Sequence, residues 1–131
     1  PHDSFATIIE RSQQDLLPLT EAFEAYFTTE GITSTAEQAG HVLGLIQGIE
    51  YAFDSCESGR DCDSSKATGW TDYPKFSIEM IVEQVGDCDD AAISVSSLLT
   101  NMNIPTYILL WYTGDNKSAH LSVGSERIQV N

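Results

Sequence analysis

Cys88 is the residue whose type and position best suit a nucleophile in this sequence. It follows Gly86 and Asp87, which favour a turn, and it opens an amphipathic segment that runs to Asn101. In the first turn of a helix, unpaired amides and the helix dipole stabilise a thiolate. The same amides can stabilise the oxyanion that forms when sulfur attacks an acyl carbon. The position therefore predicts thiol chemistry at Cys88.

The charges around Cys88 require a positive partner. Asp87, Asp89 and Asp90 flank the cysteine, and their repulsion raises its pKa unless a histidine or a cation compensates. His120 is the candidate, because a strand that returns after a hairpin turn can carry it to the helix start. The sequence predicts a Cys88–His120 pair, and the alternative is an inert buried cysteine beside a structural histidine.

The elements that must position this pair follow from the hydrophobic periodicity. Apolar residues at helical spacing predict helix over residues 5–30, with a new segment or a kink at Pro18. A capping box at residues 34–37 opens another helix, whose apolar stripe reaches Ile49. Two further helices are expected, over 76–82 and 88–101.

The last part of the chain has the composition of β-strands. Residues 106–112 and 119–123 are rich in β-branched, aromatic and aliphatic side chains, and the turn residues between them predict a hairpin. Residues 127–130 are expected to begin a third strand. Helices followed by antiparallel strands indicate an α+β fold, with N-terminal helices packed on an antiparallel sheet.

The length of 131 residues suits a single domain over 1–131, helical to about residue 103 and strand-like from 104 onward. Because the sequence begins with Pro1, we expect a processed chain or a piece of a longer one. In that case a missing segment or a partner chain completes the sheet.

The charge of the chain excludes some classes of partner. The chain has 20 acidic and 6 basic side chains, a net charge of −14 with neutral histidine, and 41% hydrophobic residues. The hydrophobic content supports a core, so the acidity does not indicate disorder. Six cations cannot neutralise a long phosphate track or an anionic lipid surface, and no apolar run spans a bilayer. We therefore expect no nucleic-acid partner and no membrane insertion, and an acidic surface that suits a high-salt, halophile-like setting.

A polar loop over residues 54–72 contains the other two cysteines, Cys56 and Cys62. A disulfide between them would restrain the loop and leave Cys88 free. It would also indicate an oxidising compartment, extracytoplasmic or at the cell surface. Two reduced thiols in a cytoplasmic protein are the alternative.

Residues of this loop are candidate ligands for two kinds of metal site. Asp61 and Asp63 offer alternating oxygen ligands for calcium, although the loop lacks the glycine and the terminal glutamate of an EF-hand. The three cysteines and His120 match the ligand count of a Cys3His zinc site. No two of them stand two to four residues apart, as structural zinc sites usually require, so a zinc-binding structural domain is the less favoured interpretation.

Four stretches of the sequence carry a resemblance to a known enzyme family. Residues 73–93, YPKFSIEMIVEQVGDCDDAAI, place an acidic residue in a helix before a Gly-Asp-Cys-Asp-Asp run. Residues 103–105 (NIP) precede the first strand, residues 119–124 (AHLSVG) contain the histidine, and residues 49–54 (IEYAFD) contain a tyrosine and an aspartate. Over residues 36–130 the chain resembles the transglutaminase-like domains of the prokaryotic and archaeal type, a branch of the papain-like cysteine enzymes.

The resemblance implies thiol acyl transfer on a peptide or protein substrate, with hydrolysis of an amide favoured over cross-linking and no cofactor required. Cys88 is then the nucleophile and His120 the general base. The third member of such a site is an Asp or Asn on the strand after the histidine. Glu126, Asn131 or a residue outside this sequence would fill that role.

Further site residues are expected around this pair. Asp89 and Gln84 are candidates for positioning and for the oxyanion, and Trp70 and Tyr73 are candidates for a substrate groove. A non-catalytic binding module on the same fold is the alternative to an enzyme.

Overall fold

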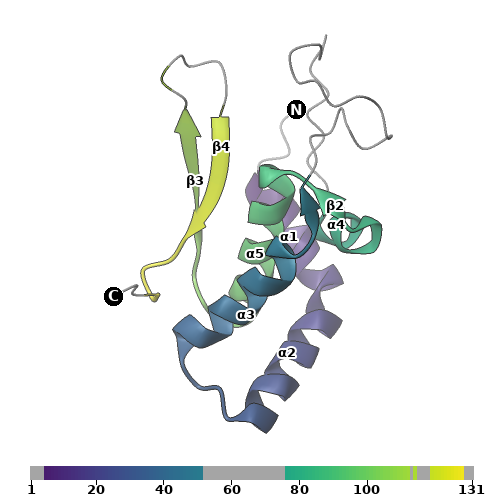
Figure 1. Cartoon of the computed structure of the whole chain (residues 1–131), viewed down its shortest axis with the longest axis vertical. Coiled ribbons are helices and arrows are strands. Elements are labelled where there is room, and N and C mark those ends of the chain that lie inside the picture. The colour runs from purple at the N-terminus through teal and green to yellow at the C-terminus, as the bar shows by residue number, and fades with distance from the viewer. Residues whose placement is uncertain (1–4, 52–75, 113, 115–118, 129–131) are drawn as a thin grey trace.

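The computed structural model describes residues 5–51, 76–112, 114 and 119–128 (Figure 1). Several predicted features lie outside these residues: the Cys56–Cys62 disulfide, the calcium ligands Asp61 and Asp63, the groove residues Trp70 and Tyr73, and the third catalytic candidate Asn131.

The first two helices are separated where the sequence predicted a break. α1 spans Phe5–Asp15 and α2 spans Leu17–Glu30, with Pro18 in the first turn of α2. Proline is accepted there because the amide it lacks has no partner inside the helix. Pro18 therefore starts a new helix.

α3 spans Thr35–Gln47 and begins at the predicted cap. The Ser34 hydroxyl accepts the Glu37 amide at 3.4 Å, which satisfies one of the unpaired amides of the first turn. α3 leads directly into a two-residue strand, β1, at Glu50–Tyr51.

α4 spans Ser77–Glu83, α5 spans Cys88–Asn101, and α5 is the centre of the fold. It contacts α1, α2, α3, α4 and both strands of the C-terminal hairpin. The periodicity predicted one apolar face, but residues 92–99 are all buried because α5 is covered on every side. Its buried serines remain satisfied, since Ser94 and Ser97 donate to the carbonyls of Asp90 and Ile93 at 2.8 and 2.7 Å.

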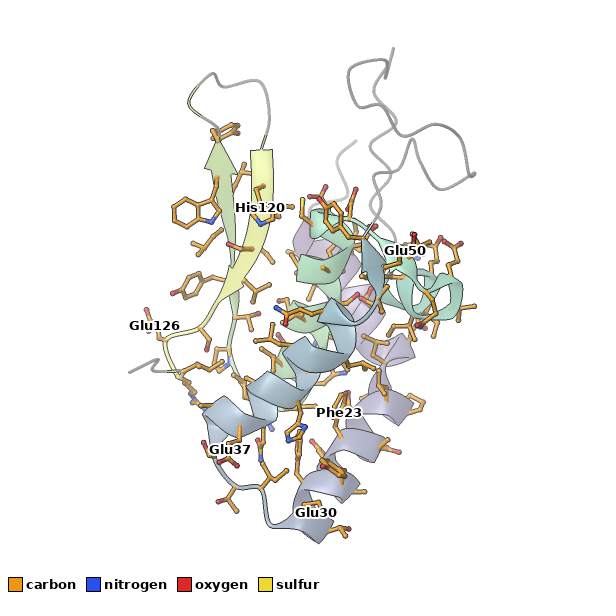
Figure 2. All side chains as sticks on the ribbon, in the orientation of Figure 1. Phe23, Glu30, Glu37, Glu50, His120 and Glu126 are labelled. Carbon is orange, nitrogen blue, oxygen red and sulfur yellow. The ribbon has the colours of Figure 1, made fainter. Side chains whose placement is uncertain are left out.

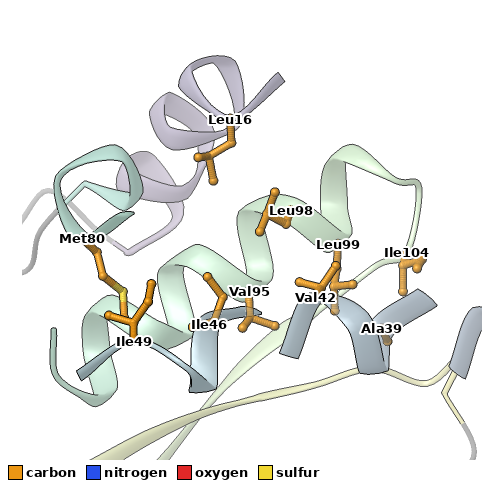
Figure 3. Packing of buried hydrophobic residues seen from close by; sticks show 10 residues of the cluster. All are labelled: Leu16, Ala39, Val42, Ile46, Ile49, Met80, Val95, Leu98, Leu99 and Ile104. Carbon is orange, nitrogen blue, oxygen red and sulfur yellow. The ribbon is translucent and has the colours of Figure 1, made fainter. Parts of the chain in front are cut away.

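The hydrophobic core lies mainly between α3 and α5 (Figure 3). Its buried residues are Leu16, Ala39, Val42, Ile46, Ile49, Met80, Val95, Leu98, Leu99 and Ile104.

A short parallel ladder that the sequence did not predict joins β1 to β2, Val85–Gly86. In this ladder Tyr51 stands opposite Gly86. The pairing therefore brings the segment after α3 beside the start of α5.

The predicted hairpin is present. β3, Tyr107–Tyr112, pairs antiparallel with β4, Ala119–Gly124, and Trp111 stands opposite His120. The predicted third strand does not begin at Arg127 or Ile128, and its remaining residues lie outside the described part. The fold is thus a mixture of helices and a small antiparallel sheet, consistent with α+β. None of the described helices is long and apolar enough to cross a membrane.

Candidate functional site

Cys88 and His120 line the same pocket. The pocket has a volume of about 410 Å³ and is bordered by α3, α5 and β4. Most of its wall is apolar, with side chains of Leu43, Ile46, Ile49, Met80, Ala91, Ala92, Val95, Leu121 and Val123. Its polar lining residues are Gln47, Tyr51, Cys88, His120 and Ser122.

The start of α5 is fixed by reciprocal caps. The Asp87 side chain accepts the amides of Asp89 and Asp90 at 3.1 and 3.3 Å, and the Asp90 carboxylate accepts the Asp87 amide at 3.0 Å. This arrangement places Cys88 in the first turn, as predicted. It also occupies two of the first-turn amides that were expected to hold an oxyanion, so those two amides already have partners.

The surroundings of the Cys88 sulfur favour its protonated form. Burial raises the pKa of the Cys88 thiol, and the neighbouring Asp89 and Asp87 carboxylates raise it further. The thiol donates to Asp89 Oδ1 at 3.4 Å. The Leu121 amide donates to the sulfur and lowers the pKa, but it does not outweigh the other effects. The lowering expected from the helix start is therefore overcome by burial and by the acidic neighbours.

His120 lies on β4, the hairpin strand nearer the helices (Figure 2). Trp111 Nε1 donates to Ser122 Oγ at 2.8 Å, so the face of the hairpin that carries Trp111 also carries Ser122 and His120. Leu121 points the other way and is buried. Four successive residues of β4, His120 to Val123, border the pocket. In the described structure no hydrogen bond joins the exposed His120 to Cys88.

Tyr51 is a site residue that sequence reasoning missed. Its hydroxyl forms hydrogen bonds with the Cys88 sulfur and with the Cys88 amide. Burial raises the pKa of Tyr51, and the Cys88 and Asp87 charges add to the increase. The only signal in the sequence was the tyrosine in residues 49–54. A two-residue strand has no periodicity that could have placed it beside Cys88.

Three other predicted residues, Gln84, Glu126 and Asp89, lie outside the set that lines the pocket. Gln84 ends α4 with a left-handed backbone at φ 58°, and its side-chain amide donates to the Ile81 carbonyl. Glu126 lies exposed in the turn after β4. Asp89, by contrast, contacts the nucleophile, but as the acceptor for its thiol proton.

Within the described ranges, no group of three or more His, Cys, Asp or Glu side chains is arranged to hold a metal ion. Two ligands of the Cys3His interpretation, Cys56 and Cys62, lie outside these ranges.

Comparisons of the chain with family models, curated proteins and solved structures found no match. The resemblance to transglutaminase-like domains therefore depends on the sequence motifs.

Proposed function

We propose that this chain is a transglutaminase-like thiol acyl-transfer enzyme that favours hydrolysis of a peptide or amide bond. The observation that carries the proposal is the shared pocket, which Cys88 lines from the first turn of α5 and His120 lines from β4. The motifs around both residues and the α+β order of the elements support it.

The proposed reaction begins with removal of the thiol proton by His120. The Cys88 sulfur bonds to the carbonyl carbon, the C–N bond breaks, and the amine leaves with the proton that His120 carried. Water then hydrolyses the thioester. His120 is exposed, and the proposed proton transfer requires its ring to approach the sulfur by a change of rotamer.

Acylation of Cys88 by an activated amide, such as an acyl p-nitroanilide peptide, tests the proposal. We expect a mass increase on the peptide that contains Cys88, lost in Cys88→Ala. Removal of a general base typically costs about 10²- to 10⁴-fold, so His120→Ala should slow acylation by that range. His41→Ala is the matched control, because His41 packs on Tyr26 away from the pocket. Equal acylation rates in the wild type and His120→Ala would contradict the proposal.

A non-catalytic module that binds an apolar group is the second candidate. The thiol donates to Asp89 and has a raised pKa, which favours an unreactive cysteine. The apolar wall of the pocket suits a hydrophobic side chain. Saturable peptide binding that Cys88→Ala leaves unchanged, with no acyl adduct on the wild type, would support this candidate.

A further inference from the structure

The hydroxyl of Tyr51 lies at the proposed nucleophile because of the β1–β2 ladder. Tyr51 pairs with Gly86, which directly precedes the N-cap residue of α5, and both Tyr51 and Cys88 line the pocket. Gly86 is buried, and a Cβ there would stand 3.0 Å from Asp90 and Met80 side-chain atoms. The close packing of Gly86 therefore fixes the strand that pairs with Tyr51.

We propose that Tyr51 is a positioning residue that stabilises the Cys88 thiolate through its hydroxyl, with the Leu121 amide as the second donor. This inference deepens the proposed function and depends on it for its role in catalysis. Tyr51 would act after deprotonation, by stabilising the negative charge on the sulfur.

The hydrogen bonds around the sulfur change direction with its protonation. As a thiol, Cys88 donates to Asp89 Oδ1. As a thiolate it has no proton to give, and it needs donors. In the part of the chain that the structure describes, the Tyr51 O–H and the Leu121 N–H are donors that contact it. A hydrogen bond to the charged form of a group favours that form.

The Cys88 amide orients the Tyr51 hydroxyl for this role. The amide donates to the Tyr51 oxygen, and the phenolic O–H contacts the sulfur of the same residue. Such a chain of bonds polarises each member and strengthens the next. A phenylalanine would keep the ring but lose both bonds.

The charged and titratable groups that surround the sulfur come from three elements. Asp87 and Asp89 at the start of α5 oppose the thiolate. Tyr51 on β1 contributes a hydroxyl, and His120 on β4 borders the same pocket. The two carboxylates make a compensating donor necessary.

The test is the pH profile of iodoacetamide labelling at Cys88, read by peptide mass spectrometry on the full chain so that Cys56 and Cys62 are resolved separately. We expect Tyr51→Phe to move the Cys88 profile to higher pH and to slow labelling at neutral pH about threefold to tenfold, the effect of one hydrogen bond. Tyr112→Phe is the matched control, because Tyr112 is exposed on β3 and does not line the pocket.

The profile separates a positioning role from a loosened fold. If Tyr51 acts on ionisation, the labelling rates of Tyr51→Phe and the wild type converge at alkaline pH, where both sulfurs are charged. Coincident profiles, or faster labelling of Tyr51→Phe at every pH, would overturn the inference. Labelling needs no substrate, so a shifted pH profile in Tyr51→Phe without amide hydrolysis by the wild type would contradict only the proposed function. Amide hydrolysis without a shift of the profile would contradict only the role of Tyr51.

Discussion

Replacing Asp89 by Asn should make Cys88 more reactive. The Asp89 carboxylate accepts the thiol proton at 3.4 Å, and its charge repels the thiolate. Asparagine keeps the shape and an acceptor oxygen but removes the charge. We therefore expect Asp89→Asn to lower the pKa of Cys88 and to raise its thiolate fraction at neutral pH.

The separation of the two groups sets the size of this effect. Two unit charges 3.4 Å apart interact by about 1 kcal/mol in water and by about 5 kcal/mol at an effective dielectric of about 20. Cys88 is half-buried beside an open pocket, so the lower part of this range applies, about 1 to 2 kcal/mol. That energy corresponds to labelling about 5- to 30-fold faster at neutral pH.

Site-resolved iodoacetamide labelling of the folded chain measures this rate. Glu24→Gln is the matched control, because it removes one charge from α2 outside the Cys88 pocket. Thermal unfolding checks that Asp89→Asn remains folded, since loss of an acid from a first turn costs only about 0.3 to 1 kcal/mol. Equal labelling of Asp89→Asn and Glu24→Gln would refute Asp89 as the group that suppresses the thiolate.

Two further predictions concern stability, measured as the free energy of unfolding in urea. Gly86→Ala should lose about 1 to 3 kcal/mol, because its Cβ is 3.0 Å from Asp90 and Met80 side chains. Gly40→Ala in α3 meets nothing within 4 Å and should gain about 0.5 to 1 kcal/mol, so losses of equal size in both variants would contradict the packing argument. Folding raises the pKa values of both Cys88 and Tyr51. Their contribution to stability is therefore complete at a pH below their pKa values in the unfolded chain, and it is lost as the pH rises through their pKa values in the folded protein. The free energy of unfolding should therefore fall at alkaline pH, and it should fall less steeply in Cys88→Ala. If it fell equally steeply in Cys88→Ala and the wild type, the Cys88 thiol would not contribute to this loss.

The parts of the site that could be predicted depend on neighbours in the sequence. The start of α5 follows from Gly86 and Asp87, because turn formation and capping involve adjacent residues. The hairpin follows from its turn composition for the same reason. Both elements were predicted within a residue or two of their observed bounds.

The parts that could not be predicted depend on register and on distant contacts. The face of β4 that carries His120 is set by its pairing with Trp111, and a slip of one residue would reverse it. The pairing of Tyr51 with Gly86 joins two residues far apart in the chain, through a ladder too short to leave a pattern. The complete burial of residues 92–99 depends on how many elements surround α5, and the hydrophobic periodicity of α5 contains no information on that number.

The central place of α5 also determines which part of the domain can move. Residues 92–99 are buried among α1, α2, α3, α4 and the hairpin, so we expect their amides to exchange hydrogen only when the whole domain opens. The hairpin is a two-stranded sheet, and its local opening costs less. Cys88 is therefore anchored at the start of the most protected helix, whereas β4 on the other side of the pocket belongs to the element that opens more easily.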